Sequence, residues 1–162
     1  MTHAPLSAFS DAASWAVELE TPADAAAVEA LVLAAFGPGR FAKTAERLRE
    51  GATPAAGFVV RREGRPIGSV RLWPIRVGAT PAFFLGPIAV EAQSRSEGMG
   101  AALVGACLEG AAGSGVLLVG DPPYFERFGF HPVPGVRLPG PVDRRRVLWK
   151  GPGQPEGPVR GA

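Results

Sequence analysis

The segment that decides the fold spans residues 83–101 and reads FFLGPIAVEAQSRSEGMGA. Residues 83–90 have the apolar composition of a strand, but a Gly-Pro pair falls in the middle, and proline donates no hydrogen bond to a sheet ladder. We therefore predict a strand that a bulge interrupts. A short loop then leads to the spacing Arg-x-x-Gly-x-Gly, from Arg95 to Gly100, where a helix over residues 98–112 is predicted to begin.

The start of this predicted helix has the features of an anion-binding site. The first N–H groups of a helix have no acceptor within it, and they carry a partial positive charge. Gly98 and Gly100 lack the Cβ atoms that would keep a ligand away from this backbone. We therefore expect a phosphate or pyrophosphate group here. Two common nucleotide motifs are excluded, because a dinucleotide fingerprint would need a glycine at Leu103 and no lysine follows a glycine as a P-loop requires.

The rest of the chain predicts a mixed α/β fold. Further strands are expected at residues 15–20, 57–63, 67–73, 116–119 and 146–149, and further helices at residues 22–36, 43–49 and 122–128. Thr21 and Asp24 form a capping signature at the start of the first helix, and a Gly-Pro pair ends that helix. We expect residues 1–14 to be an N-terminal tail, residues 15–150 to be one domain, and residues 151–162 to be a mobile Gly/Pro-rich C-terminal tail.

Composition and charge exclude several classes of protein. With 162 residues, of which 46% are hydrophobic, the chain is long enough for one domain with a buried core. A net charge of +2 is too small for general polyanion binding. The single cysteine, Cys107, excludes an intrachain disulfide and a Cys-rich zinc site, and two histidines are too few for a multi-His metal centre. No signal peptide and no apolar run of membrane-spanning length is visible, so we expect a cytoplasmic protein without metal or membrane contact.

The Arg-x-x-Gly-x-Gly spacing after an interrupted strand resembles the acetyl-CoA signature of the GNAT superfamily of N-acetyltransferases. Residues 85–90 resemble the superfamily's fourth strand, and residues 123–130 resemble its helix that ends in Gly-Phe. Residues 120–122, Gly-Asp-Pro, are similar to a bacterial subset of largely predicted acyltransferases. The resemblance covers about residues 15–132. It implies a GNAT-type central twisted mixed sheet with splayed fourth and fifth strands and with helices on both faces.

The resemblance also implies acetyl-CoA as a co-substrate. Its pantetheine arm would pair with the backbone of Ile88 and Val90 between the splayed strands, and its pyrophosphate would lie on the amides of residues 96–101. The implied cofactor-binding residues are Ile88, Ala89, Val90, Arg95, Ser96, Glu97, Gly98, Met99, Gly100, Ala101 and Phe125. The negative charge of Glu97 departs from the superfamily's pattern and is expected to oppose the phosphates.

An acid and a base are implied for the reaction. The superfamily's tyrosine, which protonates the departing thiolate, falls on Phe125, which has no hydroxyl. The adjacent Tyr124 is the candidate acid, although one residue along a helix turns a side chain by about 100°. An ammonium group has no lone pair, so a base must deprotonate the acceptor. Asp121 is the first candidate and Glu126 the second, and Asp121 has an alternative role as the cap of the following helix.

The function implied is the transfer of an acetyl or other short acyl group from acetyl-CoA to a primary amine, by direct attack in a ternary complex. The acceptor would be a small molecule or a peptide, and no nucleic-acid partner is expected. Two alternatives stay open. Phe125 is compatible with a catalytically weak module that binds acyl-CoA as a sensor, and the three arginines at residues 144–146 are compatible with an interaction domain for nucleic acid or protein. A homodimer through the predicted hairpin or the C-terminal strand also stays open.

Overall fold

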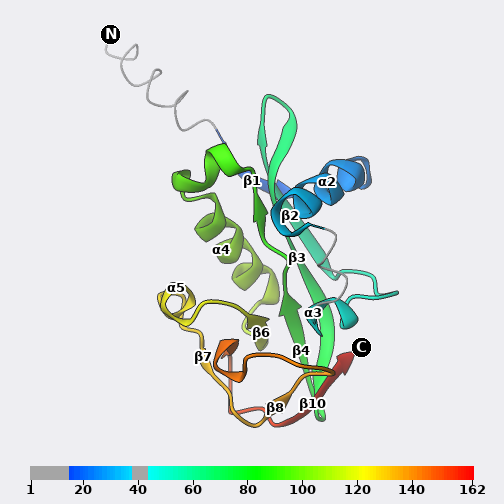
Figure 1. Ribbon diagram of the computed structural model, residues 1–162, viewed down its shortest axis with the longest axis vertical. Helices are drawn as coiled ribbons and strands as arrows, with labels where there is room; N and C mark the ends of the chain where they lie inside the picture. Colours follow the sequence, from blue (N-terminus) through cyan, green and yellow to red (C-terminus); the bar gives the residue numbers. More distant parts are fainter. Residues whose placement is uncertain (1–14, 38–43) are drawn as a thin grey trace.

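The computed structural model describes residues 15–37 and 44–162, and a ten-stranded sheet lies at the centre of this part of the chain (Figure 1). The strands are β1 (Val17–Leu19), β2 (Ala56–Arg62), β3 (Arg65–Val77), β4 (Thr80–Leu85), β5 (Ala89–Val90), β6 (Val116–Val119), β7 (His131–Pro132), β8 (Val136–Arg137), β9 (Val147–Lys150) and β10 (Gly157–Gly161). The main path has the order β1-β2-β3-β4-β6-β9-β7, and β5, β8 and β10 lie off it. Strands β4 and β6 run parallel, whereas the other neighbours on the main path are antiparallel. The mixed α/β class that the sequence predicts is confirmed.

Helices cover both faces of the sheet, as expected. They are η1 (Pro22–Asp24), α2 (Ala25–Phe36), α3 (Thr44–Arg47), η3 (Ala92–Glu97), α4 (Met99–Ala111), α5 (Pro122–Glu126) and η4 (Arg144–Arg146). Val60 of β2 lies in one buried cluster with Leu103 of α4, whereas the preceding Val59 lies in another cluster with Val28 of α2. Successive strand residues point to opposite faces of a sheet. Helices α2 and α4 therefore pack on opposite faces, on either side of β2 and β3 in Figure 1.

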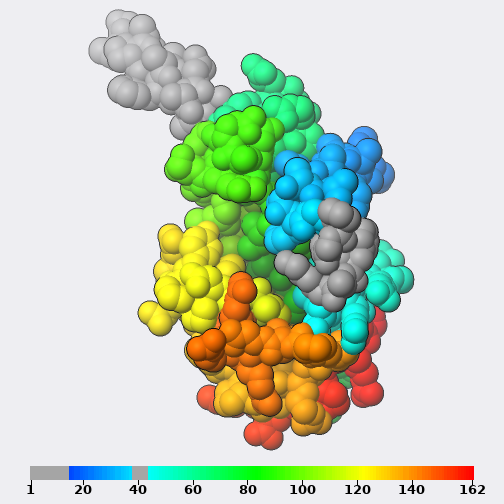
Figure 2. Space-filling model, viewed as in Figure 1, coloured from blue at the N-terminus to red at the C-terminus, as the bar shows by residue number. Residues whose placement is uncertain are grey.

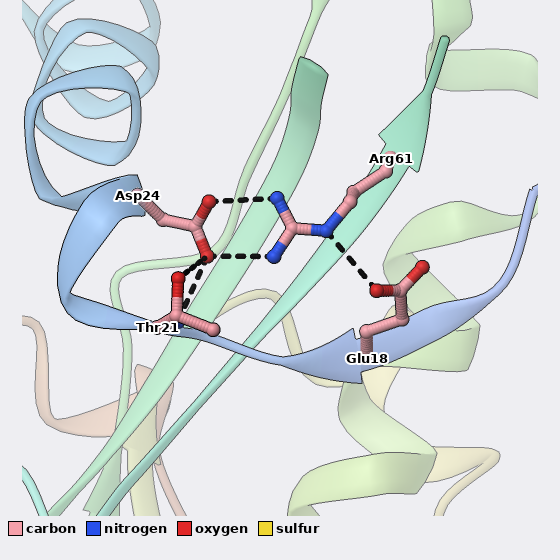
Figure 3. A network of polar contacts seen from close by, with 4 residues as sticks. All are labelled: Glu18, Thr21, Asp24 and Arg61. Atoms are coloured by element: carbon pink, nitrogen blue, oxygen red, sulfur yellow. Dashed lines mark hydrogen bonds and ion pairs between the residues drawn. The ribbon is translucent and has the colours of Figure 1, made fainter. Parts of the chain in front are cut away.

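The chain enters α2 where the capping signature predicts, and an arginine holds this turn to the sheet (Figure 3). The Asp24 carboxylate accepts hydrogen bonds from the backbone N–H of Thr21 at 2.8 Å and from the Thr21 hydroxyl at 3.1 Å. Arg61 of β2 donates to both oxygens of Asp24 at 2.7 Å and to Glu18 of β1 at 3.1 Å. The bonds from Arg61, together with those from Thr21, hold the pKa of Asp24 well below its usual range. Four side chains thus tie the start of α2 to β1 and β2.

Strand β3, with 13 residues, changes its partner in the middle of the sheet. Leu72 pairs with Leu85 at the end of β4, and Ser69 pairs with Ala89 at the start of β5. Residues 86–88 therefore face only the two residues of β3 that lie between Ser69 and Leu72. This arrangement is the bulge that the Gly-Pro pair predicts.

Strands β4 and β6 separate at the same level of the sheet. They pair only through Phe83 with Val116 and Phe84 with Leu117. Beyond these residues β5 pairs with β3, whereas β6 has only β9 as a partner, which it pairs with along its whole length. Strands β5 and β6 share no ladder in the described residues, so the splay that the resemblance implies is confirmed.

The C-terminal segment differs from the expected mobile tail over residues 151–162. Strand β10 pairs with the last three residues of β3, and Val159 at its centre is buried. The expectation is wrong because β3 extends to Val77, beyond its predicted end, while β2 covers it only as far as Leu72. Strand β10 fills the edge that remains. Glycine and proline residues around Val159 hide the strand pattern in the sequence.

Two expectations concern residues outside the described ranges: the N-terminal tail over residues 1–14, and Lys43, the first residue of the predicted helix 43–49. Among the helices that the structure describes, none is long and apolar enough to cross a bilayer. Residues 15–37 and 44–162 contain no group of three or more His, Cys, Asp or Glu side chains that could hold a metal ion.

Candidate functional site

The site is built on the break in the sheet at residues 86–88. The N–H of Gly86 donates to the carbonyl of Arg71 at 2.9 Å, and the indole N–H of the buried Trp73 donates to the carbonyl of Gly86 at 2.6 Å. Gly86 has a φ of +142°, which a residue with a Cβ rarely adopts, so a glycine is required here. Because both polar backbone groups of Gly86 are bonded, the break is a fixed feature of the sheet.

The backbone after the break presents polar groups on the side away from β3. The N–H of Glu91 donates to the carbonyl of Ile67 in β3 at 2.8 Å. Alternate residues of a strand direct their backbone groups to opposite edges, so those of Val90 point away from β3. The Val90 carbonyl accepts a hydrogen bond from Nε of Arg95 at 3.1 Å. An extended ligand can therefore pair with this edge of β5, next to Arg95.

A pocket of about 380 Å³ lies between this edge, the start of α4 and the helix α5. We call it the α4-side pocket, and it is lined by Ile88, Val90, Arg95, Gly98, Gly100, Ala101, Tyr124 and Arg127. Six of these residues belong to the implied cofactor-binding set, and Tyr124 is the candidate acid. The structure therefore brings together the interrupted strand, the Arg-x-x-Gly-x-Gly motif and the tyrosine.

Both glycines of the motif leave the start of α4 accessible. Gly98 has a φ of +83°, and a Cβ at this position would meet no atom within 4 Å. A Cβ at Gly100 would lie 3.3 Å from the hydroxyl of Tyr124. Gly100 therefore faces Tyr124 across the α4-side pocket, and a side chain at this position would narrow it.

Five implied cofactor-binding residues do not line the α4-side pocket, namely Ala89, Ser96, Glu97, Met99 and Phe125. Ala89, Met99 and Phe125 are buried in the core, and Ser96 is exposed. The Glu97 carboxylate accepts hydrogen bonds from Arg62 of β2 at 2.6 and 3.3 Å, and this bonding raises the pKa of Arg62. The charge of Glu97, expected to oppose the phosphates, is therefore compensated by Arg62.

Tyr124 and Phe125 occupy different environments in α5, as their spacing on a helix predicts. Phe125 is buried, and its ring packs on Gly120 where no Cβ would fit. Tyr124 is half-buried and lines the α4-side pocket. The guanidinium of Arg127 lies 4.3 Å from the centre of the Tyr124 ring, and its Nε donates to the Tyr124 carbonyl at 3.1 Å. Arg127 was not predicted, although a spacing of three residues places it on the same helix face as Tyr124.

A second pocket, of about 150 Å³, lies on the opposite face of the sheet, beside α2 and α3. We call it the α2-side pocket, and it is lined by Val28, Glu29, Val32, Glu46, Arg49, Ser69, Arg71, Trp73 and Pro87. None of these is a predicted site residue, because they come from separate segments that no local pattern joins. Pro87 lines this pocket and the next residue, Ile88, lines the α4-side pocket, so the two pockets lie on either side of the break. Figure 2 shows the surface hollowed between the blue segment of α2 and the yellow segment of α5.

The candidate bases Asp121 and Glu126 are exposed and line neither pocket. Asp121 occupies the N-cap position of α5, and its backbone carbonyl accepts hydrogen bonds from the N–H groups of Tyr124 and Phe125 at 3.1 Å. Its carboxylate makes no capping hydrogen bond. The structure thus places Asp121 at the start of α5 without bringing its side chain into either pocket.

Cys107 is buried in the apolar side of α4. Burial raises the pKa of its thiol to about 12. The thiol is therefore protonated at neutral pH, and a protonated thiol is a poor nucleophile. This position does not support a covalent acyl-cysteine.

The three arginines at residues 144–146 each bond within the protein. Their partners are the carbonyls of Pro134 and Gly120 and the carboxylate of Asp143. The Asp143 carboxylate bonds the side chain and the backbone N–H of Arg145, and these bonds lower the pKa of Asp143. These contacts hold η4 in place and lend no support to a nucleic-acid interface.

Comparisons with known proteins find a matching family model and similar proteins. The sequence model of the Acetyltransferase (GNAT) family matches residues 25–130, which is more than half of the chain. A relative from Escherichia coli strain K12, the uncharacterized N-acetyltransferase YhbS, is 32% identical in an alignment over 120 residues, with coverages of 70% of this chain and 72% of that protein.

Two solved structures share the fold over most of the chain. The crystal structure of the GNAT family N-acetyltransferase YhbS from Escherichia coli in complex with CoA has a TM-score of 0.77 and 25% identity, and covers 91% of this chain and 89% of its own. That of a GNAT family acetyltransferase from Brucella melitensis in complex with acetyl-CoA has a TM-score of 0.68 and 25% identity, with coverages of 91% and 96%.

Proposed function

This chain belongs to the GNAT acetyltransferase family, and from this premise we propose that it transfers an acetyl or other short acyl group from acetyl-CoA to a primary amine. The observation that carries the proposal is a break in the sheet with one pocket on each side of it. Acyl transfer needs two substrates in contact at one carbon atom, and a pocket on each side of the break would give each substrate its own approach. The bound CoA and acetyl-CoA in the Escherichia coli and Brucella structures support the choice of donor.

We assign acetyl-CoA to the α4-side pocket. Its pyrophosphate would accept hydrogen bonds from the N–H groups at the start of α4, and Arg95 and Arg127 would add positive charge. Its pantetheine arm would lie along β5 and pair with the edge of Val90 that faces away from β3, as an added strand does. The thioester would then lie beside Ile88, at the break.

The reaction follows from these positions. The neutral nitrogen of the acceptor attacks the thioester carbonyl, so that a C–N bond forms while the C–S bond breaks. A backbone N–H of Ile88 or Ala89 stabilises the oxyanion, and that of Ile88 is favoured because strand alternation directs the N–H of Ala89 toward β3. Tyr124 gives its proton to the departing thiolate, and a carboxylate or water takes the proton that the amine loses.

A second candidate function, an acyl-CoA-binding module without turnover, is favoured by one observation. Phe125, which stands where the superfamily has its tyrosine, is buried against Gly120 and brings no hydroxyl to the pocket. Both candidate functions use the α4-side pocket, and they differ only in turnover.

Thermal melting with acetyl-CoA tests the donor site. A ligand at 100 times its dissociation constant stabilises a protein by about 2.7 kcal/mol. For a chain of this length we expect a rise in Tm of about 5–10 °C. An unchanged Tm at millimolar acetyl-CoA would contradict both candidate functions.

Thiol release over a panel of primary amines then separates the transferase from the sensor. The buried thiol of Cys107, with a pKa of about 12, will not consume the thiol reagent in the folded protein. Release that depends on an amine supports the transferase. A rise in Tm with acetyl-CoA but no release with any amine supports the sensor.

A further inference from the structure

We propose that Arg62 is a positioning residue for acetyl-CoA: through Glu97 and Ser94 it holds the turn η3 in the conformation that presents the first N–H groups of α4 to the pyrophosphate. This inference rests on the proposed function and adds to it a residue that does not line the α4-side pocket. Three observations carry it: the contacts of Arg62, the small number of bonds that η3 makes by itself, and the place of Arg62 in the sheet.

The first observation is that Arg62 bonds two residues of η3. Its Nη2 donates to Oε1 of Glu97 at 2.6 Å, and its Nη1 donates to Oε2 of Glu97 at 3.3 Å and to the hydroxyl of Ser94 at 3.4 Å. Ser94 is buried, and the side chains of Arg62 and Glu97 are 32% and 31% exposed. A guanidinium that bonds both oxygens of a carboxylate fixes its orientation as well as its distance. Arg62 therefore sets the position of the end of η3, directly before Gly98.

The second observation is that η3 has little support of its own. It is a 3-10 helix of six residues, and helices of this type have poor hydrogen-bond geometry and seldom exceed about four residues. Neither η3 nor α4 has a side-chain cap at its start. Gly98, which joins them, has a left-handed conformation and no side chain that could hold it. The conformation of this turn therefore depends on contacts with the rest of the protein.

The third observation is the place of Arg62 in the sheet. It is the last residue of β2 and pairs with Arg65, the first residue of β3, at the end of their hairpin. The preceding residue, Arg61, points to the opposite face of the sheet and bonds Asp24 at the start of α2. Two successive arginines of one strand thus tie down the segments that lead into two helices, and Arg62 serves the helix that borders the α4-side pocket.

These contacts prepare the donor site in two ways. A turn that is already fixed does not have to be ordered when acetyl-CoA binds, so less of the binding free energy is lost. The guanidinium of Arg62 also neutralises the carboxylate of Glu97, which would otherwise repel the phosphates. Arg62→Lys separates the two effects, because lysine keeps the positive charge but lacks the planar fork that bonds both oxygens.

The dissociation constant of acetyl-CoA, measured by titration calorimetry, tests the role of Arg62. We expect Arg62→Ala to raise it about tenfold and Arg62→Lys to raise it at least about threefold. Wild-type affinity in a folded Arg62→Lys variant would mean that the charge alone matters, and it would overturn the positioning role.

Arg65→Ala is the matched control in the same hairpin. Arg65 also bonds this segment, at 2.6 Å from a carboxylate oxygen of Glu91, but the N–H of Glu91 already donates to the carbonyl of Ile67 in β3 at 2.8 Å. We therefore expect the dissociation constant of acetyl-CoA to change less than about twofold. A rise equal to that of Arg62→Ala would reflect the loss of any nearby positive charge and would overturn the inference.

A double-mutant cycle tests whether Arg62 acts through Glu97. In a Glu97→Ala background, Arg62→Ala should raise the dissociation constant of acetyl-CoA less than about threefold, because the partner of the arginine is already absent. The same tenfold rise in this background would mean that Arg62 contacts the ligand itself, and it would overturn the positioning role.

A donor without a pyrophosphate distinguishes positioning of the turn from a general structural role. S-Acetylpantetheine keeps the thioester and the arm that we assign to β5, but it lacks the phosphates and the adenosine. Its binding, followed by ligand-observed NMR, should be the same in the wild type and in Arg62→Ala. An equal loss of affinity for both donors would indicate general damage to the fold and would overturn the inference.

The wild type separates this inference from the proposed function, and neither result needs turnover. If the wild type binds acetyl-CoA and Arg62→Ala binds it equally well, the inference is wrong and the proposed function stands. If the wild type does not bind acetyl-CoA, the proposed function fails and the inference fails with it.

Discussion

At the scale of single residues, Tyr124 and Phe125 show how one step along a helix separates two roles. The ring of Phe125 fills the core beside Gly120, whereas the hydroxyl of Tyr124 reaches toward Gly100 in the α4-side pocket. Because Tyr124 lines the pocket to which we assign the donor, removal of its hydroxyl tests acid catalysis directly.

We predict that Tyr124→Phe lowers kcat by about 10²–10⁴-fold, since that is the usual contribution of a general acid. The dissociation constant of acetyl-CoA, measured by thermal melting, should change little. Arg127→Gln serves as the comparison, because it should weaken donor binding while leaving kcat nearly intact. The opposite pattern, a weaker donor complex with unchanged kcat in Tyr124→Phe, would assign Tyr124 to phosphate binding instead.

A second prediction at this scale concerns Asp24. Its pKa is lowered in the folded protein, chiefly by Arg61, so its contribution to stability is complete above the unfolded pKa of about 3.9 and is lost as the pH falls through the folded value. We expect Asp24→Asn to lower Tm at pH 7, and the difference from the wild type to shrink in acid. Asp143→Asn is the control, since Asp143 also pairs with an arginine but is 42% exposed, and exposed pairs contribute little. Equal effects of the two substitutions at pH 7 would contradict this account.

At the scale of elements, the first turn of helix α4 lines the α4-side pocket, whereas its middle does not. We therefore expect substitutions of Gly100 and Gly105 to have different effects. Gly100→Val should narrow the α4-side pocket beside Tyr124 and raise the dissociation constant of acetyl-CoA at least about tenfold. Gly105→Ala is the control in the same helix, because a Cβ at that position meets nothing within 4 Å. It should raise the free energy of unfolding by about 0.5–1 kcal/mol and leave donor binding unchanged. Equal donor affinity in both variants would argue against the assigned position of the pyrophosphate.

The sequence predicts elements well where a local rule decides them. The Gly-Pro pair predicts the break between β4 and β5, and Thr21 and Asp24 predict the start of the first helix, because each effect acts within a few residues. The α2-side pocket could not be predicted, since Ser69 reads as one polar residue in an alternating strand. The pocket forms only when the fold brings α2, α3 and the break together around this part of β3.

At the scale of the whole molecule, the C-terminal segment is part of the sheet. We predict that removal of residues 154–162 lowers the free energy of unfolding by at least about 2 kcal/mol, since the burial of Val159 alone is worth about that much. Denaturant unfolding measures the loss. Arg160→Ala, an exposed change in the same strand, should have little effect. An unchanged midpoint after truncation would mean that β10 adds nothing to the fold.

The freed edge of β3 should also make the truncated protein associate, because an uncovered strand edge pairs with other chains. A local sequence pattern cannot predict that a strand distant in the sequence will pair with the open edge of β3. Strand β10 lies about eighty residues from its partner in the sequence, and its only large apolar residue is Val159. This distance explains why the expected tail was wrong while the splayed strands were predicted correctly.

The break between β4 and β5 has a kinetic consequence for the proposed reaction. The two pockets lie on opposite faces of the sheet, so a coenzyme in the α4-side pocket and an acceptor in the α2-side pocket would enter and leave by separate routes. Free CoA can depart while the new amide is still in place, and the amide can depart while CoA stays. We therefore expect that neither substrate has to arrive first and that the turnover cycle has no compulsory sequence of arrivals and departures.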